Sequence, residues 1–189
     1  MDMKQLEDIL FENPIIAAVK DDSGLEKALG TDCQIIFLLY GNICTVAGLV
    51  DRIKANNKLA VVHLDLIGGL SSEDVSVSFL REKTRADGII STKAPLVKAA
   101  KEQGLLAIQR VFLIDSRALS NFYKYAESNV PDMIEILPAA MPKVIRKITA
   151  ACHLPIIAGG LISDRDDVNQ VLGNGARAVS STNPEVWQM

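Results

Sequence analysis

The sequence predicts a compact (β/α)8 TIM barrel with a short final helix. Three observations indicate this fold: short apolar runs alternate with amphipathic stretches, there are eight such runs, and they recur every 24 residues or so, about the minimum for a strand, a helix and two loops. Such alternation is typical of parallel strands joined by crossover helices. We expect a single domain over residues 1–189, because no low-complexity or Pro/Gly/Ser-rich linker divides the chain.

The eight apolar runs are the expected strands. Each is rich in β-branched or aliphatic residues and is bounded by polar residues, Gly or Pro. The runs cover residues 14–19, 34–39, 59–64, 88–91, 105–113, 133–137, 155–158 and 176–180. Aromatic residues make up only 5% of the chain, so the core must consist of Ile, Leu, Val and Ala, as in buried parallel strands.

The amphipathic stretches are the expected helices, and several carry end signals. They cover residues 43–55, 73–83, 94–103, 116–127, 143–152 and 164–172. Asp115 or the serine after it can cap one helix, Pro142 suits a first helical turn, and Ser163 with Asp166 resembles a capping box. The chain is shorter than the usual barrel of about 250 residues and ends in a stub, so an open doubly wound sheet is the alternative.

Composition limits the classes of function. A net charge of −3 and a pI near 5.4 exclude a strongly basic nucleic-acid-binding protein but allow a local basic face. Three cysteines without CxxC spacing argue against a disulfide framework and a zinc site, so we expect no metal. The N-terminus lacks signal-peptide features, and no apolar run approaches the roughly 18 residues of a membrane span. We therefore expect a cytoplasmic protein without a membrane segment.

Two strand ends form a candidate phosphate site. In such barrels, function lies where strands end and the following loops begin. Gly159 and Gly160 end the seventh expected strand and let backbone N–H groups approach an anion closely. Ser180 and Ser181 end the eighth, and a short helix expected near Pro184 would add free N–H groups. This pattern predicts a phosphate cradle, with tight turns that bind nothing as the alternative.

Charged residues at other strand ends are candidate ligand contacts. Lys20 and Lys93 directly follow expected strands and could be cations at the barrel mouth or surface caps. Asp65 could accept hydrogen bonds from ligand hydroxyls or organise its own loop. Glu135 lies inside an apolar strand, and if it is buried it needs a partner such as Lys20, Lys93 or Arg110. A ligand contact and a structural ion pair are both open for Glu135.

Familiar catalytic patterns do not occur in this sequence. We find no Ser-His-Asp order, HExxH, GxxxxGK[ST] or GxGxxG, so we expect no catalytic residue and no dinucleotide cofactor. His63 lies among leucines of an expected strand and is predicted to be a core residue, although a functional role is open.

Several separated runs carry a family resemblance. They are VHLDLIGGL at 62–70, DGIISTK at 87–93, QRVF at 109–112, EILPA at 135–139 and PIIAGGLI at 155–162. In this order, and over nearly the whole chain, they resemble the glycerol-uptake operon antiterminator family. The resemblance implies a regulator of transcription antitermination in glycerol metabolism rather than an enzyme. It also implies two binding partners, glycerol 3-phosphate and leader messenger RNA, and no resident cofactor.

The resemblance also implies positions for the ligand. Its phosphate would contact Gly159, Gly160, Ser180 and Ser181, and its glycerol end would face Lys20, Asp65, Lys93 and Glu135. It indicates no RNA-contacting residue. The sequence itself offers Lys143, Arg146 and Lys147 on one helical face, and a second basic cluster at 81–85, as candidate RNA-binding groups. A solvated helix face is the alternative for each cluster.

Two other classes of function are open. The first is an enzyme acting on a small phosphorylated sugar or triose, in which Lys20 or Lys93 forms a Schiff base or Glu135 and Asp65 divide acid and base roles. The second is a barrel that serves only as an assembly partner. The oligomeric state is also open, because the apolar tail near Trp187 could cover this barrel or a neighbouring subunit of a homo-oligomer.

Overall fold

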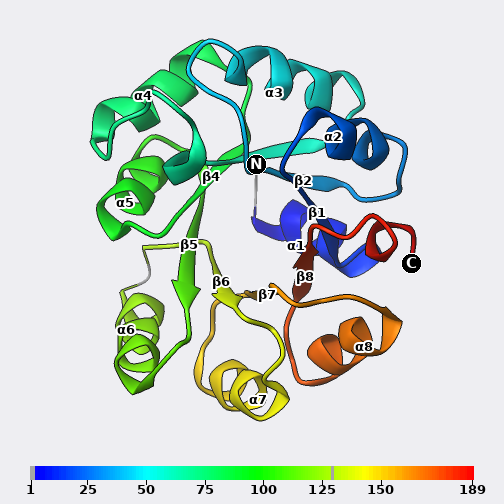
Figure 1. The fold of residues 1–189 in the computed structure, drawn as a ribbon. Helices are drawn as coiled ribbons and strands as arrows, with labels where there is room; N and C mark the ends of the chain where they lie inside the picture. Colours follow the sequence, from blue (N-terminus) through cyan, green and yellow to red (C-terminus); the bar gives the residue numbers. More distant parts are fainter. Residues whose placement is uncertain (1–2, 129) are drawn as a thin grey trace.

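The computed structural model describes residues 3–128 and 130–189. Eight parallel strands close into a barrel in chain order (Figure 1), which confirms the predicted (β/α)8 TIM barrel and excludes the open doubly wound sheet. The closing pair is β8 with β1, in which Ile16 lies opposite Ser180. None of the described helices is long and apolar enough to cross a membrane.

Each strand overlaps the apolar run predicted for it. The strands are β1 (Ile15–Val19), β2 (Ile35–Leu38), β3 (Leu59–His63), β4 (Gly88–Ser91), β5 (Leu106–Phe112), β6 (Met133–Leu137), β7 (Ile156–Gly159) and β8 (Ala178–Ser181). The helices are α1 (Met3–Glu12), α2 (Asp22–Leu29), α3 (Val46–Ala55), α4 (Asp74–Lys83), α5 (Ala94–Glu102), α6 (Ser116–Glu127), α7 (Pro142–Ala151) and α8 (Arg165–Gly173), with short 3₁₀ turns η1 (Leu64–Leu66) and η2 (Val186–Gln188).

The barrel has two apolar layers, because successive side chains of a strand point to opposite faces. On β3, Val62 packs outward against the helices, whereas Val61 packs into the lumen. Phe37 and Ile157 are fully buried in the same lumen layer. The inner layer therefore fills the barrel below the level at which polar side chains begin.

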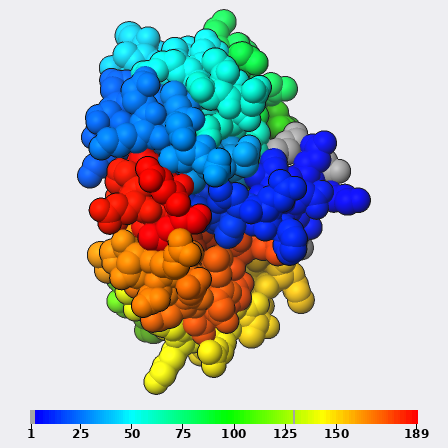
Figure 2. Space-filling model, turned by 90° about the vertical axis from the view of Figure 1, so that its right-hand side faces the viewer, coloured from blue at the N-terminus to red at the C-terminus, as the bar shows by residue number. Residues whose placement is uncertain are grey.

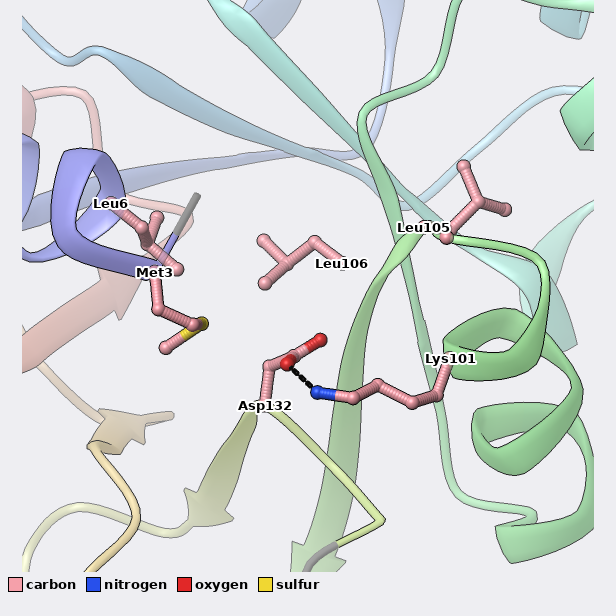
Figure 3. Close-up of a pocket in the computed structure, with 7 residues that line it drawn as sticks. Met3, Leu6, Lys101, Leu105, Leu106 and Asp132 are labelled. Carbon is pink, nitrogen blue, oxygen red and sulfur yellow. Dashed lines mark hydrogen bonds and ion pairs between the residues drawn. The ribbon is translucent and has the colours of Figure 1, made fainter. Parts of the chain in front are cut away.

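Helix α1 covers the N-terminal end of the barrel. Its buried residues Leu6 and Leu10 join the lumen layer, and the helix projects from one edge of the molecule in Figure 2. Beside it lies a cleft of about 260 Å³, lined by Met3 and by the Lys101–Asp132 ion pair (Figure 3). Asp132 also accepts a hydrogen bond of 2.9 Å from the amide of Ala107, so it fixes the start of β6.

The C-terminal segment covers the barrel of its own chain. It lies between α2 and α8, where Figure 2 shows it in red. Trp187 is buried, and its Nε1 donates to the carbonyl of Ser181 over 2.7 Å. The short final helix predicted near Pro184 forms as the 3₁₀ turn η2, which begins two residues later at Val186. The side chain of Asn183 accepts from the amide of Glu185 over 3.0 Å, in agreement with its predicted capping role.

Helix ends largely follow the predicted signals. Asp115 caps α6 by accepting 2.7 Å from the amide of Ala118, and Pro142 is the first residue of α7. The capping box of α8 lies one residue later than the predicted pair Ser163 and Asp166, because Asp164 is the N-cap residue. Asp164 accepts from the amide of Asp167 over 2.9 Å, and Asp167 accepts from the amide and hydroxyl of Ser163 over 2.9 and 2.8 Å.

Candidate functional site

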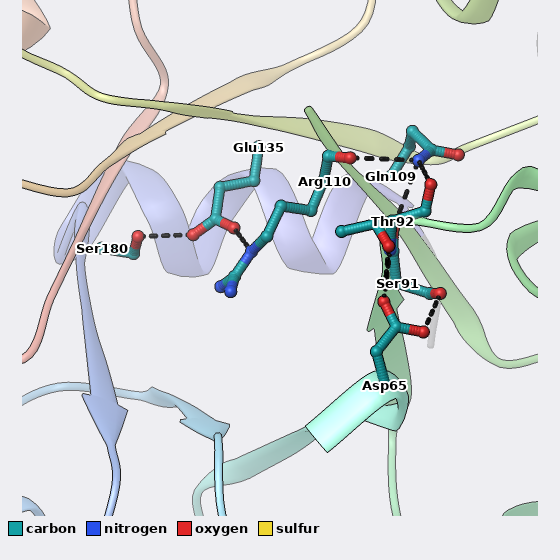
Figure 4. Close-up of polar contacts among 7 residues, drawn as sticks. All are labelled: Asp65, Ser91, Thr92, Gln109, Arg110, Glu135 and Ser180. Atoms are coloured by element: carbon teal, nitrogen blue, oxygen red, sulfur yellow. Dashed lines mark hydrogen bonds and ion pairs between the residues drawn. The ribbon is translucent and has the colours of Figure 1, made fainter. Parts of the chain in front are cut away.

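A chain of polar side chains crosses the lumen at the C-terminal end of the barrel (Figure 4). Glu135 of β6 is completely buried, pairs with Nε of Arg110 on β5, and accepts 2.6 Å from the hydroxyl of Ser180 on β8. Of the two roles open for Glu135, the structure therefore shows the ion pair. Removing one partner of such a buried pair typically costs about 3–5 kcal/mol, because the other charge stays buried and unpaired.

Arg110 keeps two nitrogens uncommitted. Glu135 uses Nε, whereas Nη1 and Nη2 have no partner among the described residues. Both nitrogens are accessible to solvent. Within the described part of the chain, the only buried side-chain nitrogen or oxygen without a hydrogen-bond partner belongs to His63. The guanidinium thus presents two free NH2 groups to the mouth, in the fork that suits carboxylate and phosphate oxygens.

His63 lies near Arg110 on the lumen side of β3. It is 3% exposed, and its Nδ1 is buried without a partner among the described residues. Burial, helped by the Arg110 cation, lowers the pKa of His63 to about 4, so the imidazole is neutral at pH 7. A buried polar atom left unsatisfied costs about 1–3 kcal/mol. The position agrees with the predicted core residue, but its hydrogen bonding is incomplete.

Gly159 and Gly160 shape the end of β7. A β-carbon on Gly159 would lie 2.3 Å from Oγ of Ser180, so the Ser180–Glu135 hydrogen bond itself requires glycine there. Gly160 has a φ of +76°, in the left-handed region that favours glycine. Leu161 follows with a φ of +62° and a side chain that is 73% exposed. A leucine held in this conformation stores strain, which is common at functional sites.

The loops after β7 and β8 lie side by side. The hydroxyl of Ser181 donates to the carbonyl of Ile162 over 3.1 Å, and the side chain of Asn183 donates to the carbonyl of Ser163 over 3.0 Å. Both predicted serines thus use their hydroxyl protons inside the protein, since Ser180 donates to Glu135. A phosphate could therefore receive hydrogen bonds here from backbone amides but not from these hydroxyls as they are arranged.

Several amides at these loops are free. Those of Gly160, Leu161, Ile162 and Thr182 donate to no acceptor within residues 3–128 and 130–189. The amides of Ser163 and Asn183 are already used, by the carboxylate of Asp167 and by Oγ of Ser181. Free amides near a barrel's last two strands are the usual means of holding a phosphate in this fold.

Asp65 and Lys93 bind neighbouring loops. Asp65 accepts from Oγ of Ser91 over 2.7 Å and from the amide and hydroxyl of Thr92 over 2.7 and 2.8 Å (Figure 4). Burial raises the pKa of Asp65, but these hydrogen bonds outweigh it and hold the pKa below its usual value. Lys93 is exposed, and its Nζ donates to Ser72 in the preceding loop. Both groups organise the loops around the mouth.

Lys20 lies apart from this network. It is exposed and lines a pocket of about 190 Å³ together with Lys27, Ser23 and Thr182. Thr182 carries one of the free amides, so this pocket adjoins the loop after β8. Asp21 also lines this pocket, so two lysines and one carboxylate share it.

Gln109 is a site residue that the sequence did not indicate. It is 1% exposed, and its Nε2 donates to the carbonyls of Ser91, Thr92 and Arg110 over 3.2, 3.1 and 3.1 Å. It therefore fixes the same turn that Asp65 holds from the other side. Arg110 itself was considered only as a partner for Glu135, and the signal for both residues was a polar pair inside the apolar run 105–113.

The candidate RNA-binding residues lie outside the mouth on α7. Lys143, Arg146 and Lys147 are all exposed, and Nε of Arg146 donates to the side chain of Asn174 over 2.9 Å. Lys143 is in the first turn, beside the end of β6. The three cations thus form a short row that begins at the rim of the barrel.

The arrangement suits binding better than proton transfer. A fixed cation, the free amides and an exposed lysine can hold an anion. Asp65 and Glu135, the acid and base of the enzymatic alternative, both act as hydrogen-bond acceptors inside the protein.

Comparisons with known proteins agree along almost the whole chain. The family model described as "Glycerol-3-phosphate responsive antiterminator" matches residues 15–187. The Escherichia coli protein YgcP is 45% identical over 181 residues, which cover 96% of this chain and 95% of YgcP.

Two solved structures are similar in both sequence and fold. A glycerol uptake operon antiterminator regulatory protein from Listeria monocytogenes is 37% identical with a TM-score of 0.88, over 93% of this chain and 95% of the other. A glycerol uptake operon antiterminator-related protein from Thermotoga maritima is 30% identical with a TM-score of 0.82, over 93% and 98%.

Proposed function

Because the chain belongs to the glycerol-3-phosphate responsive antiterminator family, we propose that it binds glycerol 3-phosphate at the barrel mouth and then binds leader messenger RNA of glycerol-metabolism genes. In this role it is a cytoplasmic regulator of transcription antitermination. Glycerol 3-phosphate is an effector, and no resident cofactor is needed.

The free edge of Arg110 is the observation that carries the ligand proposal. Its Nη1 and Nη2 are uncommitted while Glu135 holds Nε, so the cation is fixed in place before any ligand arrives. A preorganised guanidinium loses little freedom when it binds an anion, and each charged hydrogen bond contributes about 1.5–3 kcal/mol. A phosphate ester is the class of ligand that such a fork and the neighbouring free amides favour.

The predicted contact residues have distinct roles in this proposal. The phosphate lies on the free amides of Leu161, Ile162 and Thr182, with Arg110 and Lys20 supplying charge. Gly159, Gly160, Ser180 and Ser181 shape this seat, because their contacts fix the two loops. Asp65, Lys93 and Glu135 act on the glycerol end through the loops and the guanidinium that they hold.

Calorimetry with glycerol 3-phosphate tests the ligand proposal. We expect binding to the wild-type protein and a loss of at least tenfold in affinity for Arg110→Met, since one charged hydrogen bond at 1.5–3 kcal/mol corresponds to roughly 10–100-fold. Lys98→Met is the matched control, because Lys98 is exposed on α5 and pairs only loosely with Glu102 at 3.8 Å. Equal affinities for the wild type and Arg110→Met would contradict the proposal.

The RNA part requires linkage between two sites. If glycerol 3-phosphate stabilises the state that binds RNA, RNA must strengthen ligand binding by the same factor. A gel-shift titration against a leader hairpin, with and without the ligand, measures this factor. An RNA affinity that the ligand leaves unchanged would contradict the coupling.

The enzymatic alternative predicts turnover. Incubation with trioses, phosphorylated sugars and glycerol phosphates, followed by mass spectrometry, should give no product if the protein is a regulator. Any product that depends on Lys20 or Lys93 would instead support an enzyme that forms a Schiff base with its substrate.

A further inference from the structure

The incomplete hydrogen bonding of His63 points to a second part of the ligand site. Its Nδ1 is sealed in the protein without a partner among the described residues. Its Nε2 also makes no hydrogen bond within the described part of the chain. Nε2 is accessible to solvent, because Nδ1 is the only buried and unpartnered side-chain nitrogen there. The imidazole thus offers one accessible and unused nitrogen.

Nε2 of His63 lies inside the barrel mouth. Val61 packs in the lumen and Val62 packs outside, so the alternation along β3 places His63 on the lumen side. The charge of Arg110 acts on His63, so the two side chains lie within Coulombic range of each other. Both side chains are at least nine-tenths buried, at 3% and 9% exposure.

A purely structural role does not account for a histidine here. The lumen layer on one side of it is apolar, with Val61, Ile90 and Ile108 among its members, and Arg110 is the polar neighbour on the side of the mouth. An apolar side chain of similar size would pack in this layer without leaving nitrogens unsatisfied. A group that arrives from outside can bond the accessible Nε2, whereas the sealed Nδ1 stays without a partner.

The chemistry of the ring suits a hydroxyl. A neutral imidazole has one donor and one acceptor, and a hydroxyl can serve either of them. A phosphate dianion has no proton to give and would favour a charged ring, which the adjacent Arg110 cation opposes. Arg110 is the group that matches the anion, and His63 is the group that matches an uncharged polar neighbour of that anion.

We propose that Nε2 of His63 binds a hydroxyl of the ligand, so that His63 and Arg110 together recognise a polyol phosphate rather than any phosphate ester. This inference rests on the proposed function and adds the residue that distinguishes a hydroxylated carbon chain from a bare one. It assigns the deeper part of the mouth to the polyol and the β7 and β8 loops to the phosphate.

A two-ligand comparison tests the inference. Calorimetry would measure glycerol 3-phosphate and n-propyl phosphate, which has the same charge and carbon number but no hydroxyl. We expect the wild type to prefer glycerol 3-phosphate by about tenfold and His63→Leu to reduce this preference to about threefold or less, with n-propyl phosphate bound equally by both proteins. His153→Gln is the matched control, because His153 lies in the loop before β7, at the opposite end of the barrel.

The outcomes separate the two proposals. Binding of glycerol 3-phosphate with an unchanged preference in His63→Leu overturns this inference alone. No binding to the wild type overturns the proposed function and this inference with it. Should His63→Leu not fold, ¹⁵N spectra of the wild type give the same answer, since the chain has only 2 histidines. We expect glycerol 3-phosphate, but not n-propyl phosphate, to shift the Nε2 resonance of His63, and an identical effect of both ligands would overturn the inference.

Discussion

The hydroxyl of Ser180 occupies the space in which a β-carbon on Gly159 would lie. The separation would be 2.3 Å from Oγ of Ser180 and 3.0 Å from Oε1 of Glu135. The same hydroxyl donates to Glu135 over 2.6 Å, and Glu135 in turn fixes Arg110. The glycine at the end of β7 and the serine at the end of β8 are therefore one matched pair that supports the guanidinium of the proposed site.

Gly159→Ala should destabilise the fold. The new methyl group must displace Ser180 or β7, and overpacking of this kind costs about 1–3 kcal/mol. Urea unfolding would measure the loss in the free energy of unfolding. Gly48→Ala is the control, because Gly48 lies within α3 and a β-carbon there meets nothing within 4 Å. Alanine in a helix is favoured over glycine by about 1 kcal/mol, so the control should gain stability. Equal effects of the two substitutions would contradict the steric argument.

Local sequence patterns predicted the eight strands. They also predicted which end of the barrel carries the site. Apolar runs bounded by Gly, Pro and polar residues gave eight strands, and barrel closure then required the segments near Gly160 and Ser181 to be neighbours. The Ser181–Ile162 hydrogen bond shows that they are. The short final helix near Pro184 forms as a 3₁₀ turn, whereas the anchoring of Trp187 on Ser181 is a tertiary contact without a local signal.

The partners of the polar side chains had no local signal. Glu135 was compatible with Lys20, Lys93 or Arg110, and only the register of β5 against β6, which sets Arg110 opposite Glu135, selects one. The proton of Ser180 goes to a residue 45 positions earlier in the chain. Hydrophobic periodicity indicates which face a residue occupies but not which distant group it meets.

The Arg110–Glu135 pair should show strong energetic coupling. Arg110→Met and Glu135→Leu should each cost about 3–5 kcal/mol, because each leaves a buried charge without its partner. The double variant leaves none, so its cost should be well below the sum of the two. A double-mutant cycle from urea unfolding measures the difference, and additivity within about 0.5 kcal/mol would contradict the coupling.

His63 should make the stability of the protein depend on pH. Burial, with the Arg110 cation, lowers the pKa of His63 from 6.5 to about 4 in the folded state. The unfolded chain then binds a proton near pH 6.5 that the folded chain does not bind until about pH 4. The contribution to stability is complete above pH 6.5 and is lost as the pH falls towards 4, by about 3 kcal/mol in total.

Denaturant unfolding at pH 7 and pH 4.5 would measure this loss in the wild type and in His63→Leu. Carboxylates titrate in both proteins, so the difference between the two slopes isolates His63. The leucine variant should lose less stability on acidification. Parallel curves for the two proteins would show that the imidazole keeps an ordinary pKa in the fold.

Asp65 should control the order of the loop after β4. Asp65→Ala removes acceptors from Ser91 and from both donors of Thr92. We expect a loss of about 1–3 kcal/mol in stability and faster hydrogen exchange at the amide of Thr92, which donates to Asp65 over 2.7 Å. Exchange at the amide of Leu113, which is bonded to the carbonyl of Leu137, is the internal control. Unchanged exchange at Thr92 would contradict the assigned role.

The basic row on α7 should set the salt dependence of RNA binding. Neutralising Lys143, Arg146 and Lys147 together to glutamine removes up to three phosphate contacts, and each contact with single-stranded RNA contributes about −0.7 to the slope of log K against log salt concentration. We therefore expect the slope for a leader RNA to become less steep by about 2, with ligand affinity unchanged, because these side chains lie outside the mouth. The control neutralises Arg81, Lys83 and Arg85, which lie at the end of α4 and the start of the loop to β4, at the opposite end of the barrel. If the salt slope becomes less steep in the control variant and stays unchanged in the α7 variant, the RNA-binding face lies at the N-terminal end of the barrel instead.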